Sequence, residues 1–188
     1  MKLGLWLVLM SLVVVVGVEV ALAKVCKGVS FPDQAQVDGS ALTLNGLGLR
    51  QATMLKVNVY VAGLYVTKPS ADASALLAAN NRKQLILQFL RNVSAAELNK
   101  AWEEGFDKSL AAFKDHLETL KGWMIDMKTG QRLTFDYKPT AGVQVDVNGT
   151  AKGTIAGDDF AKALFSIWLG AKPSDPSLKS GLLGGACG

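Results

Sequence analysis

The strongest constraint on the fold is an alternating run at residues 55–66. Leu55, Val57, Val59 and Val61 occupy every second position, and Lys56, Asn58, Tyr60 and Ala62 lie between them. This period of two is typical of a β-strand. Gly63 interrupts the run, and Pro69 ends it. The chain therefore builds at least one long strand early in the sequence.

Shorter alternating runs predict further strands at residues 84–90, 133–137 and 143–147. Asn148-Gly149 follows the last of them and predicts a tight hairpin to residues 150–155, because its turn needs positive φ at both central residues. A glycine-interrupted strand is expected at residues 42–50, where Gly46 and Gly48 predict a bulge or the close approach of another group.

Helices are predicted between and after these strands. Ser94 and Glu97 form a capping box. The helix they open carries an apolar stripe of Leu98, Trp102, Phe106, Ser109 and Phe113. Helical spacing continues through Leu117, Leu120, Met124 and Met127 into a second helix, which is either continuous or broken at Gly122. Asp158 or Asp159 is expected to cap an amphipathic helix that ends at Gly170. The order of strands, helices, strands and helices favours an α+β fold with an antiparallel sheet packed against a helical layer.

Residues 1–23 have the layout of a secretory signal peptide. Lys2 precedes an apolar run, and Ala21-Leu22-Ala23 offers small residues at a cleavage site. The alternative is an uncleaved membrane anchor, but the run is short for a bilayer about 30 Å thick. We expect cleavage after Ala23, a single domain over residues 24–188, no membrane span after cleavage, and a periplasmic or secreted protein.

The two cysteines, Cys26 and Cys187, lie near the ends of the mature chain. In an oxidising compartment two thiols pair, and chain termini often lie close together, so we expect a structural disulfide. A redox-active pair is the alternative, although such pairs usually have Cys-x-x-Cys spacing.

Charge and motifs argue against several function classes. The net charge of +4 comes from Lys and Arg residues scattered among Asp and Glu, which does not indicate a nucleic-acid-binding surface. His116 is the only histidine, and a metal site needs more ligands. No phosphate-binding glycine loop is present. The sequence therefore predicts no metal and no cofactor, and it gives no oligomeric state.

Three segments resemble bacterial chalcone isomerase-like proteins, relatives of plant chalcone isomerases and of plant fatty-acid-binding proteins. They are residues 44–50, residues 56–66 with Gly63-Leu64-Tyr65-Val66, and residues 149–170 with Gly153-Thr154-Ile155. The resemblance implies an open-faced β-sandwich, in which helices cover one face of a large antiparallel sheet.

The resemblance also implies site residues. Arg50 matches a catalytic Arg of the plant isomerases, Tyr60 falls near a hydroxyl residue that is usually Thr, and Ile167 matches a polar position in the last long helix. Around residues 93–101 the isomerases use a Tyr and an Asn, whereas this chain has no Tyr there and only Asn99 nearby. The catalytic set is thus mostly absent.

We therefore expect a non-catalytic binding protein for a fatty acid or a similar hydrophobic acidic molecule, with Arg50, Tyr60 and Ile167 at the ligand. A guanidinium grips a carboxylate through two parallel hydrogen bonds, and apolar walls hold a tail. The alternative for Arg50 is an internal salt bridge with an Asp or Glu, or a place at a strand end. The alternative functions are an isomerase or intramolecular lyase that uses Arg50 and Tyr60, and an interaction module of the cell envelope.

Overall fold

The computed structural model describes residues 22–52, 55–78, 80–106 and 112–188. Most of the expected signal segment lies outside these residues, as does Ser109 of the predicted helical stripe. Among the described residues, no helix is both long and apolar enough to cross a bilayer.

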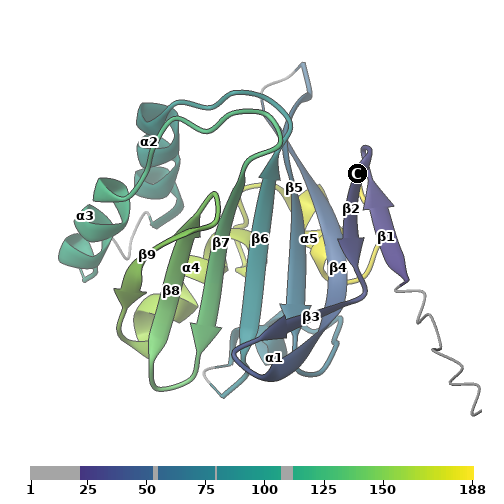
Figure 1. Cartoon of the computed structure of the whole chain (residues 1–188), viewed down its shortest axis with the longest axis horizontal. Helices are drawn as coiled ribbons and strands as arrows, with labels where there is room; N and C mark the ends of the chain where they lie inside the picture. Colours follow the sequence, from purple (N-terminus) through teal and green to yellow (C-terminus); the bar gives the residue numbers. More distant parts are fainter. Residues whose placement is uncertain (1–21, 53–54, 79, 107–111) are drawn as a thin grey trace, which may run out of the picture.

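The main sheet is a meander of seven antiparallel strands, each paired with its neighbours in sequence (Figure 1). The strands are β3 (Gln34–Val37), β4 (Ser40–Ala52), β5 (Val57–Val66), β6 (Lys83–Phe89), β7 (Arg132–Lys138), β8 (Gly142–Val147) and β9 (Thr150–Ile155). Asn148 and Gly149 join β8 to β9 with φ of 51° and 81°, which confirms the predicted turn. The strands β1 (Ala23–Cys26) and β2 (Val29–Pro32) form a separate hairpin.

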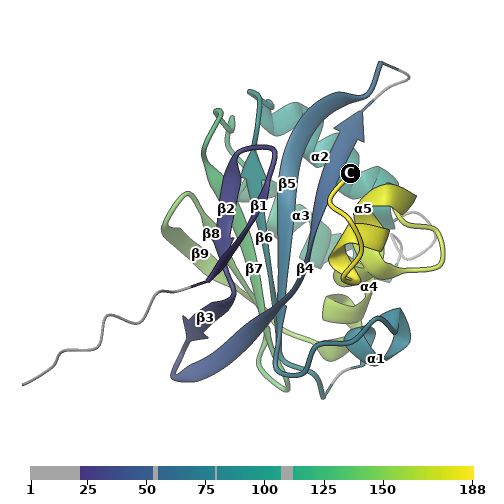
Figure 2. The same ribbon diagram turned by 90° about the vertical axis from the view of Figure 1, so that its right-hand side faces the viewer.

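Helices cover one face of this sheet, and the β1–β2 hairpin lies on the opposite face (Figure 2). The helices are α1 (Ala73–Leu77), α2 (Ala95–Phe106), α3 (Lys114–Gly122), α4 (Asp158–Leu169) and α5 (Pro176–Leu182). This is the α+β arrangement that the order of sequence patterns predicted, a large antiparallel sheet under a helical layer.

The long strands β4 and β5 are buried on both faces because a core lies on each side of them. The larger core joins the sheet to the helices and includes Leu64 and Leu87. The smaller core lies under the β1–β2 hairpin, where Phe31 packs among Leu42, Val61 and other residues. From Val61 to Val66 the alternation thus assigns side chains to two cores: Val61 and Tyr65 lie in the smaller core, and Leu64 and Val66 in the larger one. At the start of the predicted strand Leu55 and Val57 are exposed, and β5 begins at Val57.

The glycines of β4 allow α5 to lie directly on the strand. A Cβ atom on Gly46 would lie within clashing distance of the backbone oxygen of Gly181. The register of β4 against β5 shifts between Leu44 and Gly46. At this bulge the Asn45 side chain donates to the backbone oxygen of Leu182 at 2.6 Å. The sequence predicted a bulge or a close approach here, and the structure has both.

The predicted disulfide is present. Cys26 of β1 bonds to Cys187, with Cα atoms 6.0 Å apart. It ties the β1–β2 hairpin to the segment that follows α5.

One local prediction was wrong. Neither Asp158 nor Asp159 caps α4, whose N-cap is Gly157; Asp158 instead accepts hydrogen bonds from the Tyr137 hydroxyl at 2.9 Å and from the Thr140 backbone. Of the two alternatives for the second helix, the structure has the one that ends at Gly122. Met127, which continues the helical spacing, instead forms an antiparallel bridge with Val93.

Candidate functional site

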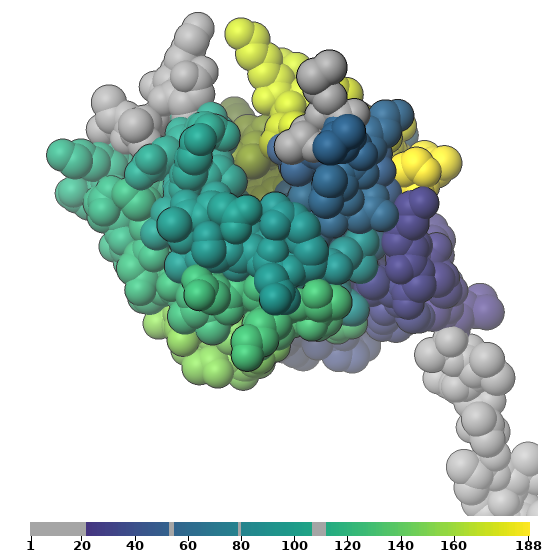
Figure 3. Space-filling model, turned by 90° about the horizontal axis from the view of Figure 1, so that it is seen from above, coloured from purple at the N-terminus to yellow at the C-terminus, as the bar shows by residue number. Residues whose placement is uncertain are grey.

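A pocket of about 1230 Å³ lies between the helix-facing side of the sheet and the helices α2 and α4. The surface is hollowed at this end of the molecule, between α2 and the β4–β5 hairpin (Figure 3). Apolar walls come from the strands and from both helices: Val59, Leu87, Phe89, Leu98, Trp102, Phe106 and Ile167. The sheet face supplies the first three, and the stripe predicted for α2 supplies the next three. A pocket with such walls suits an apolar molecule.

The capping box fixes the start of α2 beside the pocket. The backbone N–H of Ser94 donates to Glu97 at 2.9 Å, and the backbone N–H of Glu97 donates to the Ser94 hydroxyl at 3.2 Å. The hydrogen bond from the Ser94 backbone is the main cause that lowers the pKa of Glu97, with Arg91 and the Ser94 hydroxyl adding to it. The predicted cap is confirmed, and it holds Leu98 and Trp102 toward the sheet.

Arg50 lies at the rim of the pocket, on β4. Its Nη1 atom donates to the backbone oxygen of Gln51 at 2.6 Å and lies 3.4 Å from Oδ2 of Asp175. The guanidinium is thus in both environments that the sequence left open, at a pocket and beside an internal carboxylate. Within the described part of the chain, Nε and Nη2 of Arg50 make no hydrogen bond, so these donors are available to a ligand.

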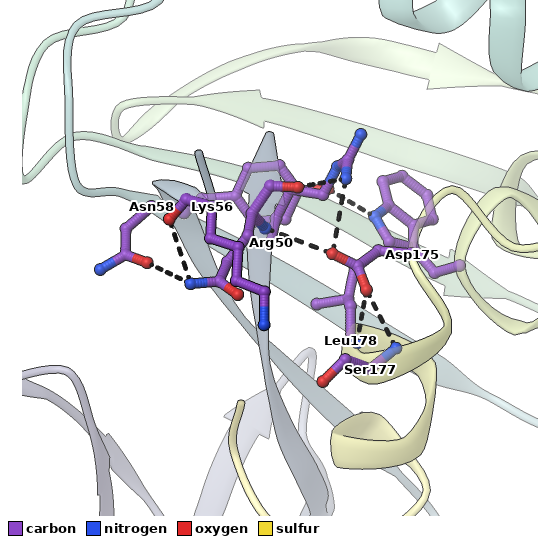
Figure 4. Close-up of polar contacts among 9 residues, drawn as sticks. Arg50, Lys56, Asn58, Asp175, Ser177 and Leu178 are labelled. Carbon is purple, nitrogen blue, oxygen red and sulfur yellow. Dashed lines mark hydrogen bonds and ion pairs between the residues drawn. The ribbon is translucent and has the colours of Figure 1, made fainter. Parts of the chain in front are cut away.

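Asp175 joins Arg50 to the start of α5 (Figure 4). It is the N-cap of that helix, and its Oδ1 atom accepts from the backbone N–H groups of Ser177 and Leu178. Its Oδ2 atom accepts from the backbone N–H of Gln51 at 3.3 Å, beside the contact with Arg50. One carboxylate therefore connects β4, the pocket rim and α5.

Tyr60 lies directly opposite Arg50 in the pairing of β4 with β5. Directly opposed residues in antiparallel strands point to the same face of the sheet, and both line the pocket. The indole N–H of Trp168 donates to the Tyr60 hydroxyl at 3.0 Å. Burial raises the pKa of Tyr60 from 10.0 to about 12, so the phenol keeps its proton at neutral pH. That proton makes no hydrogen bond within the described residues, and Tyr60 is a donor to the pocket.

Comparison with known proteins identifies the family. The model of the chalcone isomerase-like family matches residues 23–184. The chain belongs to this family. No curated protein matches the sequence.

Among solved structures, the chain is similar to the fatty-acid binding protein AtFAP1 of Arabidopsis thaliana. The superposition has a TM-score of 0.72 at 17% sequence identity and covers 86% of this chain and 96% of the plant protein. At this identity the likeness shows the fold, a chalcone isomerase-like α+β fold with a large antiparallel sheet, as the sequence predicted.

Ile167 is the third predicted site residue, and in this member of the family it forms an apolar wall. It is buried on α4 and lines the pocket. A Cβ atom on Gly105 of α2 would lie 2.9 Å from its Cδ1 atom, so the two helices meet at this pair. Arg50, Tyr60 and Ile167 thus all lie at one pocket.

Sequence reasoning missed two polar groups of this site. Trp168 was given no role in the site, whereas its indole N–H donates to the hydroxyl of Tyr60. Asp175 was not singled out, although an Asp directly before Pro176 is a typical start of a helix. This pattern predicts that Asp175 caps a helix, but it does not show that Asp175 lies beside Arg50.

Proposed function

We propose that this protein binds a fatty acid, or a similar hydrophobic acid, and does not convert it chemically. The observation that carries the proposal is the apolar pocket with Arg50 at its rim and Tyr60 beside it. The solved structure named as a fatty-acid binding protein shares the fold, which supports the same function for this chain.

The walls account for binding of an apolar chain. Leu87, Phe89 and Trp102 present hydrocarbon and aromatic surface to the pocket, and burial of each methylene group stabilises a complex by about 0.8 kcal/mol. The pocket volume of about 1230 Å³ exceeds the range of about 300–1,000 Å³ common for small-molecule sites. A long acyl chain therefore fits.

The donors at the rim account for binding of a headgroup. Arg50 offers Nε and Nη2, and Tyr60 offers its hydroxyl proton, to an oxygen atom of the ligand. Hydrogen bonds from a guanidinium to a carboxylate are among the stronger ones in proteins. An acid that enters tail first would place its carboxylate between these two side chains.

The same geometry argues against isomerase chemistry. Tyr60 has a pKa of about 12, which makes it a poor proton donor near neutral pH. Ile167 places hydrocarbon at the position where the plant isomerases have a polar side chain. Binding without turnover is therefore the favoured function.

We also propose that the protein is exported and that residues 1–23 are removed. The disulfide between Cys26 and Cys187 supports this, since such bonds persist in oxidising compartments. The test is to express the complete coding sequence and to measure the intact mass of the product in each cell fraction. A product beginning at Lys24 outside the cytoplasm is expected, and a cytoplasmic product with an intact start would contradict the proposal.

The binding proposal is tested with purified protein and unbranched fatty acids of increasing length. Native mass spectrometry looks for co-purified acids, and displacement of a fluorescent apolar probe gives affinities. Ala163→Phe narrows the pocket, which Ala163 lines, and should shift the preferred chain to shorter acids. Ala151→Phe, at an exposed position of β9, is the matched control and should change nothing. Folded protein that binds no acid of any length would exclude the proposal, and turnover of a chalcone would favour the isomerase.

A further inference from the structure

Asp175 is a fixed negative charge beside the headgroup site. Three backbone N–H groups hold its carboxylate without any help from Arg50: those of Ser177 at 2.9 Å, Leu178 at 3.2 Å and Gln51 at 3.3 Å. Its side chain is only 14% exposed. The carboxylate therefore stays in place whether or not a ligand draws Arg50 away.

The contact of Asp175 with Arg50 is a loose one. The distance of 3.4 Å between Nη1 and Oδ2 exceeds the range of about 2.7–2.9 Å expected for a strong charged hydrogen bond. The Arg50 side chain is 29% exposed, which weakens the pairing through solvent screening. Nη1 also donates to the Gln51 backbone, so both contacts use one nitrogen.

The charges of the pair cancel at the point where a headgroup would bind. An acidic headgroup must compete with Asp175 for the charge of Arg50. A neutral headgroup, such as an alcohol or an ester carbonyl, accepts hydrogen bonds from Arg50 and Tyr60 and does not depend on that charge. The internal carboxylate therefore lowers the preference of the pocket for acids.

We propose that Asp175 sets the selectivity of this pocket between acidic and neutral amphiphiles, and that the protein binds both. This inference rests on the proposed function, since it requires a ligand with its headgroup at Arg50. The ligand class is then wider than fatty acids and includes long-chain alcohols and monoacyl esters. Asp175 acts through Arg50 and is a positioning residue.

Other charges near the pocket do not discriminate in the same way. Arg91 pairs with Glu97 at 3.1 Å, and Lys100 lies 3.9 Å from Glu104. Lys162 and Lys172 also line the pocket, and they attract an acid whether residue 175 is Asp or Asn. When two variants differ only at residue 175, the attraction of these lysines for an acid is the same in both and does not affect the comparison.

The test measures the affinities of palmitic acid and of hexadecanol, which share one chain and differ in headgroup charge. For the original protein the two values should lie within about tenfold of each other. Asp175→Asn keeps an oxygen that caps α5, because Asn is as good an N-cap as Asp, and it removes the charge. We expect it to raise the ratio of acid affinity to alcohol affinity by about tenfold or more, with the alcohol affinity nearly unchanged.

A double mutant shows whether the effect of Asp175 on ligand selectivity depends on Arg50. In an Arg50→Gln background, Asp175→Asn should change the ratio by less than about threefold, because the competition for the guanidinium is gone. Asp175→Ser, which also caps α5, should reproduce the effect of Asn if the charge is responsible. Circular dichroism and melting curves verify the fold of each variant.

The outcomes distinguish this inference from the proposed function. If neither palmitic acid nor hexadecanol binds, the proposed function fails and the inference fails with it. If both bind but the ratio is the same with Asp, Asn and Ser at residue 175, the selectivity role of Asp175 is excluded while the binding function stands. An equal rise in the Arg50→Gln background would also exclude it, since the effect would then not pass through Arg50.

Discussion

The indole nitrogen of Trp168 lies 3.0 Å from the hydroxyl oxygen of Tyr60, and this hydrogen bond joins helix α4 to strand β5 at the pocket. Trp168 is 1% exposed, and the phenol is the acceptor of its indole N–H. The pair thus serves two purposes, because it satisfies a buried donor and it leaves the phenol proton for a ligand.

Replacement of Tyr60 by Phe should destabilise the protein and weaken ligand binding together. The change leaves the indole N–H of Trp168 without an acceptor, which costs about 1–3 kcal/mol. Urea unfolding followed by tryptophan fluorescence measures the loss. A double-mutant cycle with Trp168→Phe gives the coupling of the pair, which we expect at about 1 kcal/mol. A coupling near zero would mean that the contact does not contribute to stability.

The stability of the protein should rise as the pH increases from 8 to 10. Burial lowers the pKa of Lys83 from 10.5 to about 8, while its Nζ donates to the backbone oxygens of Ala78 and Asn81. Between these two pKa values the unfolded chain binds a proton that the folded chain does not bind, so unfolding becomes harder as the pH rises, by up to about 1.4 kcal/mol per pH unit.

Urea midpoints at pH 8, 9 and 10 measure this effect, and the Lys83→Met variant should lose it. Above pH 10 the sign reverses, because burial raises the pKa of Tyr60, Tyr65 and Tyr137 to about 12. There the folded chain retains protons that the unfolded chain releases, and stability falls in both proteins. A rise of the same slope in Lys83→Met would contradict the assignment to Lys83.

Removal of the disulfide should cost roughly 3–5 kcal/mol of stability. The bond between Cys26 and Cys187 spans 161 positions, and closure of a long loop restricts the unfolded chain strongly. Melting temperatures with and without a reductant measure the effect in the original protein. The variant with both cysteines changed to Ser should melt early and should not respond to the reductant.

Gly46→Ala should destabilise the protein by about 3 kcal/mol or more. The new Cβ would overlap the backbone oxygen of Gly181, and backbone atoms cannot move aside as a side chain does. Gly122→Ala is the control, because nothing lies within 4 Å of a Cβ at Gly122, and Ala is the better helix former. Equal stability of the two variants would mean that α5 does not depend on its close approach to β4.

The strands and the helices around the pocket were predictable because their signals are local. Alternation in residues 55–66 and the Asn148-Gly149 turn each specify a conformation within a few residues, and the Ser94–Glu97 box does the same for α2. The hairpin of β1 and β2 was missed because each strand has four residues, too few to show a period. Helical spacing failed at Met127 because pairing with Val93 takes precedence over a local pattern.

The site was predictable only in part, since its contacts join distant segments. Arg50 and Tyr60 lie on adjacent strands, and both came from the resemblance to a family. Asp175 lies 125 positions from Arg50, and no periodicity connects the two. A carboxylate partner for Arg50 was an open alternative, but its identity depended on where α5 starts relative to β4.

The disulfide between Cys26 and Cys187 can form only after almost the whole chain has been synthesised. Cys26 is made early and its partner only after 160 further residues, so the disulfide cannot hold β1 and β2 until synthesis is nearly finished. Any product that stops short of residue 187 carries an unpaired thiol on the first strand. Labelling of thiols would therefore separate finished chains from truncated ones, and a cellular oxidoreductase that meets Cys26 could make the same distinction.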